Sequence, residues 1–172
     1  MKKKYYEFIR NLSDTEARVI WSYAGANKQM PQSLVLVNSL GPIEALRYIL
    51  DDNINDNILE LQKTMFEILD TINLKKVFEF LKMRKIRIIT PLDKLWPQNF
   101  TSPLIGYNAP IILYILGDQN NFNKCKLDKM VSFVGSRNMT NYGKIVTNEL
   151  VFGMLENGYS IISGGALGVD SV

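Results

Sequence analysis

Apolar residues recur every three to four positions through the first half of the chain, the period of a helix with one buried face. The helices predicted from this pattern cover residues 14–24, 42–50, 58–69 and 74–81. Ser13 with Glu16 three residues later fits a capping box, and Pro42 suits the first turn of a helix. We therefore expect a small helical unit with its aromatic and methionine side chains in the core.

Beyond residue 85 the pattern changes to short apolar runs bounded by glycine, proline or asparagine, which are typical of buried strands. These runs cover residues 86–90, 111–116, 129–134 and 159–163. Val146, Leu150 and Met154 predict a helix between the last two. Thr140 suits the N-cap of that helix and Gly158 its C-terminal end. A strand–helix–strand segment predicts parallel strands with a right-handed crossover, so the chain is of the α/β class.

Charge is unevenly distributed, although the net charge of +3 is too small to prove a nucleic-acid partner. Residues 21–70 are acidic, whereas residues 75–94 hold a basic cluster. Its members are Lys75, Lys76, Lys82, Arg84, Lys85, Arg87 and Lys94, against Glu79 and Asp93. Such a cluster is more often a solvated helix face than a binding surface.

Several chemistries are excluded by residue type. The chain has no histidine and a single cysteine, Cys125, which removes histidine-based catalysis, a disulfide within one chain and a cysteine-based zinc site. We predict no catalytic residue, no metal site and no cofactor.

The basic start of the chain lacks the apolar region of a signal peptide, and the longest apolar run is far below the ~20 residues that span a bilayer. A cytoplasmic protein is expected.

Two glycine-containing turns follow the last two predicted strands, "GSR" at 135–137 and "SGGALG" at 163–168. If those strands are parallel neighbours, both turns lie at the carboxyl edge of the sheet, where open α/β sheets bind ligands. Gly135 allows close approach to the backbone, and Arg137 offers bidentate hydrogen bonds to phosphate. The pair of turns predicts a phosphate site. The alternative is that each turn only makes a tight strand-to-helix connection.

The predicted phosphate- or nucleic-acid-binding residues extend from the turns into the following helix. They are Gly135, Ser136, Arg137, Tyr142, Gly143, Lys144, Ser163, Gly164 and Gly165. Tyr142 either stacks on a base or packs locally. No dinucleotide fingerprint is present, and Ile145 stands where a P-loop needs Ser or Thr.

Four stretches together resemble the DNA-processing protein A family (DprA, also called Smf). They are "ITPLDKLWPQNF", "APIILYILGD", "VGSRNMTNYG" and "SGGALGVDS". The first pair includes Asp93, Trp96-Pro97 and Gly117-Asp118. The similarity is specific over residues 86–172 and only general before them.

The resemblance implies an extended Rossmann-like domain that binds single-stranded DNA without catalysis and helps to load RecA recombinase during natural transformation and recombination. It assigns Arg137 to the DNA pocket and aligns Ser163 and Gly164 with the family's second turn. Many relatives carry arginine where this sequence has Leu167.

The resemblance also sets the expected domains. Residues 1–72 form a helical domain of the SAM or helix-hairpin-helix type, and residues 73–172 form the N-terminal part of the Rossmann-like domain. We expect an incomplete doubly wound parallel sheet holding the strands at 111–116, 129–134 and 159–163. The surfaces for RecA and for homodimerisation are expected beyond residue 172, in a full-length form of which this chain is a truncated part.

Three alternatives remain open from the residues. One is an enzyme like the phosphoribohydrolases of nucleoside monophosphates, although their Pro-Gly-Gly loop is absent. Another is an inactive truncated product. In the third, the helical region is a protein-interaction module.

Overall fold

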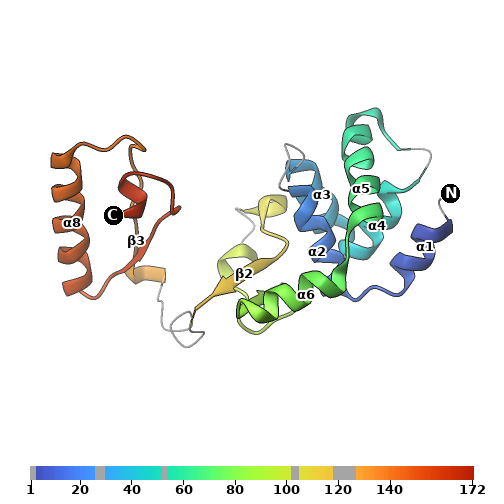
Figure 1. The fold of residues 1–172 in the computed structure, drawn as a ribbon, viewed down its shortest axis with the longest axis horizontal. Helices are drawn as coiled ribbons and strands as arrows, with labels where there is room; N and C mark the ends of the chain where they lie inside the picture. Colours follow the sequence, from blue (N-terminus) through green and yellow to red (C-terminus); the bar gives the residue numbers. More distant parts are fainter. Residues whose placement is uncertain (1–2, 26–29, 52–53, 102–104, 118–126) are drawn as a thin grey trace. The chain divides into compact units, whose positions relative to one another are not determined.

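The computed structural model describes residues 3–25, 30–51, 54–101, 105–117 and 127–172. The chain divides into two compact units, Met1–Gly117 and Asp118–Val172 (Figure 1). Each unit contains one two-stranded sheet in its described part.

Helices form most of the first unit. They are α1 (Lys3–Arg10), α2 (Asp14–Gly25), α3 (Met30–Leu40), α4 (Pro42–Ile49), α5 (Leu59–Thr71) and α6 (Leu74–Met83). The four predicted helices are confirmed as α2, α4, α5 and α6. The sequence analysis missed α1, whose buried face is only Tyr5 and Ile9, and α3, whose valines favour strands by intrinsic propensity.

Local hydrogen bonds explain where two of these helices begin. The Ser13 N–H donates to Glu16 Oε2 at 2.8 Å, and the Glu16 N–H donates to Ser13 Oγ at 3.2 Å, so the capping box of α2 is confirmed. Asn73 caps α6 in a similar way, because its Oδ1 accepts the Lys76 N–H at 3.0 Å. Both caps pair N–H groups that a helix start leaves without an internal partner.

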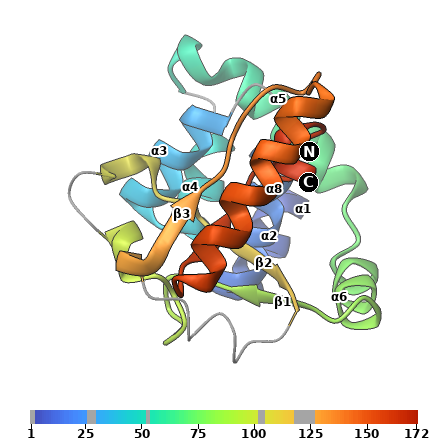
Figure 2. The same ribbon diagram turned by 90° about the vertical axis from the view of Figure 1, so that its left-hand side faces the viewer.

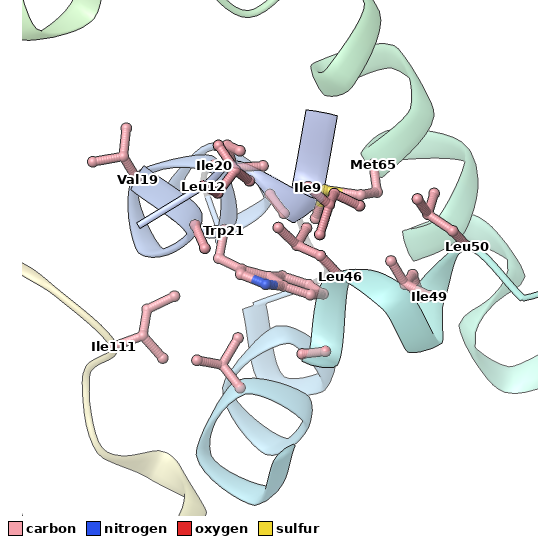
Figure 3. Packing of buried hydrophobic residues seen from close by; sticks show 14 of the residues in the cluster. Ile9, Leu12, Val19, Ile20, Trp21, Leu46, Ile49, Leu50, Met65 and Ile111 are labelled. Carbon is pink, nitrogen blue, oxygen red and sulfur yellow. The ribbon is translucent and has the colours of Figure 1, made fainter. Parts of the chain in front are cut away.

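The core of the first unit surrounds Trp21 of α2, whose side chain is fully buried. Figure 3 shows Leu46 of α4 beside the Trp21 ring, with Met65 of α5 and Ile9 of α1 among the surrounding side chains. The indole N–H donates to the Pro42 carbonyl at 2.9 Å, which ties α2 to the start of α4. Full burial of each large apolar side chain stabilises the fold by roughly 1.5–3 kcal/mol, so this unit has a core of its own.

A buried arginine attaches the segment after residue 105 to the helices. Arg18 of α2 donates from Nη1 to the Ile111 carbonyl at 2.9 Å and forms an ion pair with Asp14 at 2.6 Å. Its charge is therefore paired where water is largely excluded. Ile111 and the neighbouring Ile112 are themselves buried in the helical core.

The first sheet consists of β1 (Ile86–Ile89) and β2 (Leu113–Leu116), which pair antiparallel with Ile86 opposite Leu116. The expectation that the strand at 111–116 joins a parallel sheet with the later strands is wrong for the described residues. Run length and composition mark a strand, but they do not encode which neighbour it pairs with or in which direction.

The two compact units meet at residues 117 and 118, not at 72 and 73. Helix α6 contacts β1, and β2 pairs with β1, so residues 74–116 group with the helices rather than with the second unit. A boundary between compact units is not the same as a boundary between family domains. The domain boundary at residues 72 and 73, which the family resemblance implies, therefore stays a prediction.

The second unit contains β3 (Met130–Ser132), α8 (Asn141–Glu156) and β4 (Ser160–Ile162), followed by a short 3-10 turn, Val169–Ser171. Figure 2 shows α8 in orange to red and β3 in lighter orange, and α8 contacts β4. Together with the helical first unit, this parallel strand–helix–strand arrangement is consistent with an α/β protein whose Rossmann-like part is incomplete. Among the described residues, every buried hydrophobic side chain lies in the first unit.

Candidate functional site

The last two strands run parallel, as predicted, with Met130 opposite Ser160 and Ser132 opposite Ile162. The Phe133 N–H donates to the Ile162 carbonyl at 2.8 Å and continues the pairing past the end of β3. Parallel strands have their carboxyl ends at the same edge, so the turn that follows β3 and the turn that follows β4 both start there.

Helix α8 separates the two strands and has the predicted ends. Thr140 is its N-cap, because the side-chain oxygen accepts the Gly143 N–H at 3.0 Å. At the other end, Gly158 has φ +76°, and its N–H donates to Leu155 while the Tyr159 N–H donates to Met154. This is the Schellman arrangement, which stops the helix and returns the chain to β4.

The two turns contact each other directly. The Val169 N–H donates to the Ser136 carbonyl at 3.2 Å. Gly168 has φ +91°, and a Cβ there would lie 2.1 Å from the Ser136 oxygen, so only glycine fits. A Cβ on Gly135 would lie 2.7 Å from the Val169 side chain. Packing against Val169 is thus a structural reason for glycine at 135, and the prediction that an approaching anion requires it stays a prediction.

Asp170 joins the turns by its carboxylate. Oδ1 accepts the Gly135 N–H at 3.3 Å and Oδ2 accepts the Gly164 N–H at 3.1 Å. The Ser163 hydroxyl donates to the Asp170 carbonyl at 2.7 Å, and the Gly165 N–H donates to Ser163 Oγ at 3.3 Å. Two of the N–H groups expected to bind a phosphate are therefore already bonded to a carboxylate of the chain itself.

Arg137 lies next to this junction and is exposed. Within the described part of the chain, its side chain makes no hydrogen bond and no ion pair, and the same holds for Lys144. Ser136 is engaged locally, because its hydroxyl accepts the Asn138 N–H at 3.1 Å. Arg137 and Lys144 are therefore the cations of the predicted site that remain available to an anion.

Apart from Arg137, the predicted residues fall into two groups. The turns bring together Gly135, Ser136, Ser163, Gly164 and Gly165 around Asp170. Tyr142, Gly143 and Lys144 lie in the first turn of α8. The Tyr142 side chain is 77% exposed, and Lys144 lines a hollow of about 460 Å³ together with Gly168 and Ser171. Whether any of the nine binds a ligand stays a prediction.

The sequence analysis missed Gly168, Val169 and Asp170 as parts of this junction. The third glycine of "SGGALG" was a signal for a second residue with positive φ. For Asp170 no local pattern indicated this role, because its partners lie as far as 35 residues away. The carboxylate places a negative charge beside the turns, which does not favour an anion at the Gly135 and Gly164 N–H groups.

The upstream stretch shared with the family has structural explanations. Asp93 Oδ2 accepts the Thr90 N–H at 2.7 Å and closes the turn that follows β1. Trp96 is buried and its ring packs against Phe100 at 5.6 Å between centroids. Asp118 and Cys125 lie outside the described residues.

These features define a class: a helical region joined to a Rossmann-type strand–helix–strand unit with paired turns at the carboxyl edge. The family model described as "DNA recombination-mediator protein A" matches residues 87–172. The chain belongs to this family.

Two relatives with assigned names are similar over different lengths. The "Putative DNA processing protein DprA" of Mycobacterium tuberculosis (strain CDC 1551 / Oshkosh) is 29% identical over 171 residues, covering 91% of this chain and 41% of that protein. The "DNA processing protein DprA" of Bacillus subtilis (strain 168) is 36% identical over 66 residues, covering 38% of this chain and 21% of that protein. The chain thus spans about two-fifths of the length of the Mycobacterium tuberculosis protein. No solved structure is significantly similar.

The described residues contain neither a membrane-spanning helix nor a metal-binding cluster. In that part of the chain no helix is long and apolar enough to cross a bilayer. No group of three or more cysteine, aspartate or glutamate side chains there is arranged to hold a metal ion.

Proposed function

We propose that this chain supplies a single-stranded-DNA contact in a DNA-processing protein of recombination and DNA uptake. The observation that carries the proposal is the exposed Arg137 beside two turns that pack together at the carboxyl edge of a parallel strand pair. A strand of DNA passing that edge would meet Arg137 as a hydrogen-bond donor to its phosphates, with Lys144 as a second cation and the exposed Tyr142 ring as a stacking surface.

The proposed role is binding without catalysis. The chain has no histidine to act as a general base. Asp170, the carboxylate at the junction, is occupied by the N–H groups of Gly135 and Gly164. Protection of a strand needs phosphate contacts and stacking, not a proton-transfer group.

Family membership supports the proposed role in DNA processing and recombination. The names of the relatives refer to DNA processing, and the description of the family refers to recombination mediation. We extend this to the chain by proposing that it works with a RecA-type recombinase and that the full-length form is a homodimer.

The first test is the affinity of the 172-residue chain for labelled oligo-dT at fixed salt. Arg137→Ala is expected to weaken binding by on the order of 1–3 kcal/mol, because one charge-assisted, bidentate contact is lost. Arg137→Lys should recover only part of this, since lysine lacks the planar fork. Arg10→Ala is the matched control, because Arg10 is also exposed and lies on α1.

Two further measurements separate the alternatives. Log K should fall with log salt at a slope near −0.7 times the number of phosphates contacted, as for single strands. Unchanged affinity in Arg137→Ala would remove Arg137 from the site. Turnover of a nucleoside monophosphate would instead favour an enzyme of the phosphoribohydrolase kind.

A further inference from the structure

A groove on the first unit combines exposed aromatic rings with a lysine. Tyr23 of α2, Phe80 of α6 and Tyr114 of β2 line it together with Lys76, and its volume is about 480 Å³. We call it the α6 groove. It belongs to the compact first unit and is formed without any of the residues of the two turns.

The three rings are partly open to solvent. Tyr23 is 45% exposed, Phe80 49% and Tyr114 41%. Single exposed rings are ordinary on a protein surface, but three rings from three different elements that line one groove mark an interaction surface. The aromatic residues of the first seventy positions were expected from the sequence to be core, and Tyr23 is instead at the surface.

One of these rings is held in a fixed position. The hydroxyls of Tyr114 and Ser22 are 2.8 Å apart and share a hydrogen bond. Burial of part of the side chain also raises the pKa of Tyr114 above its ordinary value of 10.0, so the ring stays neutral at physiological pH. A neutral, oriented ring loses little freedom when a flat ligand stacks on it.

The charge at the groove is positive. Lys76, Phe80 and Arg84 follow one another at intervals of four residues, so they share one face of the helix and its last turn. The Arg84 guanidinium carbon lies 5.5 Å from the centre of the Phe80 ring. From residue 74 to residue 89 there is one acid, Glu79, against six cations. The cations are Lys75, Lys76, Lys82, Arg84, Lys85 and Arg87.

We infer that the α6 groove binds single-stranded nucleic acid, with bases stacked on Phe80 and the two tyrosines and phosphates held by Lys76 and Arg84. Rings and cations together complement a strand with unpaired bases, because each base offers a flat face and each link carries a negative charge. A neutral apolar peptide would make no use of the cations. The inference adds a second contact surface for the ligand in the proposed function, but it does not depend on Arg137.

The test uses the 172-residue chain, labelled oligo-dT and a set of matched variants. Phe80→Ala is expected to weaken binding about five- to tenfold by loss of one stacking surface, and Phe80→Tyr should keep most of the affinity. Tyr48→Ala is the control for an exposed ring, because Tyr48 is 43% exposed on α4 and does not line the groove.

The cation is tested in the same way. Lys76→Glu should weaken binding more than Lys75→Glu, which changes the charge of the same helix by the same amount outside the groove. Photo-crosslinking with oligo-dT that carries 5-iododeoxyuridine should attach the strand to peptides containing Tyr23, Phe80 or Tyr114. These results would support nucleic-acid binding at the α6 groove, whether or not Arg137→Ala changes the affinity for oligo-dT.

The outcomes that overturn the inference are distinct from those that overturn the proposed function. If Phe80→Ala and Lys76→Glu bind as well as the unmodified chain, or if crosslinks fall only within residues 127–172, the α6 groove is not a nucleic-acid site. If Arg137→Ala alone is without effect, the groove stands and the site at the turns fails. Absence of measurable binding by the unmodified chain overturns both.

Discussion

Asp170 shows how a single side chain determines the local geometry of the turn junction. Its two carboxylate oxygens accept the N–H groups of Gly135 and Gly164, which belong to different turns. Hydrogen bonds to a charged acceptor are about twice as strong as those between neutral groups, so the ionised carboxylate holds the turns together.

This bonding predicts a shared effect of removing the carboxylate. In Asp170→Ala the amide signals of Gly135 and Gly164 should both shift, measured by NMR on the 172-residue chain, because both N–H groups lose their acceptor. Asp128→Ala, an exposed change in the same unit, should leave both signals in place. A shift of only one of the two amides in Asp170→Ala would show that they do not share the carboxylate.

A second carboxylate predicts a dependence of stability on pH. The hydrogen bond from the Lys4 ammonium at 2.6 Å, followed by that from the Tyr5 hydroxyl at 2.9 Å, lowers the pKa of Asp70 below its ordinary value of 3.8. Because the pKa is lower in the folded state, the stabilisation is present above pH 3.8 and is lost as the pH falls through the folded-state value.

Urea unfolding of the unmodified protein and of Asp70→Asn measures this effect. The variant should be less stable at neutral pH, and the difference should shrink as the pH is lowered below about 3.8. Glu67→Gln is the control, because Glu67 is also exposed on α5. A difference that stays constant down to strongly acidic pH would contradict the assignment. The pair is exposed at the surface, so its contribution is small.

At the scale of the secondary-structure elements, two glycines differ in whether they could carry a side chain. Gly153 in α8 could, whereas Gly168 in the turn after β4 could not. Gly153 lies inside α8, and a Cβ added there would meet nothing within 4 Å. Gly168 has φ +91° and its Cβ would collide with the Ser136 carbonyl oxygen. The same substitution should therefore have opposite effects at the two positions.

Gly153→Ala should stabilise α8 by roughly 0.5–1 kcal/mol, because alanine loses less backbone freedom in a helix. Gly168→Ala should open the contact between the turns, because the clash is with backbone and no rotamer relieves it. Helix content by circular dichroism reports the first, and the amide shifts of Ser136 and Val169 report the second. Equal effects of the two changes would contradict the described backbone at residue 168.

For the whole molecule, the distribution of buried side chains is the main feature. In the described part of the chain all buried hydrophobic residues belong to the first unit, whereas the second exposes large side chains. Those on α8 are Tyr142, Ile145, Leu150, Phe152 and Leu155. Burial of apolar surface is the dominant stabilising term, so the first unit is expected to be the more stable by itself.

Hydrogen exchange of the 172-residue chain tests this expectation. Amides of α2, α4 and α5 should exchange slowly, while those of β3 and β4 should exchange quickly unless another chain covers the exposed apolar side chains. Slow exchange in β3 and β4 of an isolated monomer would show that the second unit is stable without added burial.

The sequence by itself determined the elements whose signals are local. Caps such as Ser13 with Glu16, and Thr140 with Gly143, join residues three positions apart, so the backbone of one turn decides them. The parallel pairing of β3 and β4 also followed from the sequence, because a helix lies between the strands and such connections favour parallel strands.

Only the tertiary structure decided the contacts between distant residues. The sequence did not indicate that β2 pairs antiparallel with β1, that Val169 requires glycine at 135, or that Ser22 and Tyr114 meet across 92 positions. These contacts depend on the path of the whole chain and on which surfaces exclude water together. Hydrophobic periodicity records that a residue is buried or exposed, but not against what, so the α6 groove appears only when α2, α6 and β2 are packed.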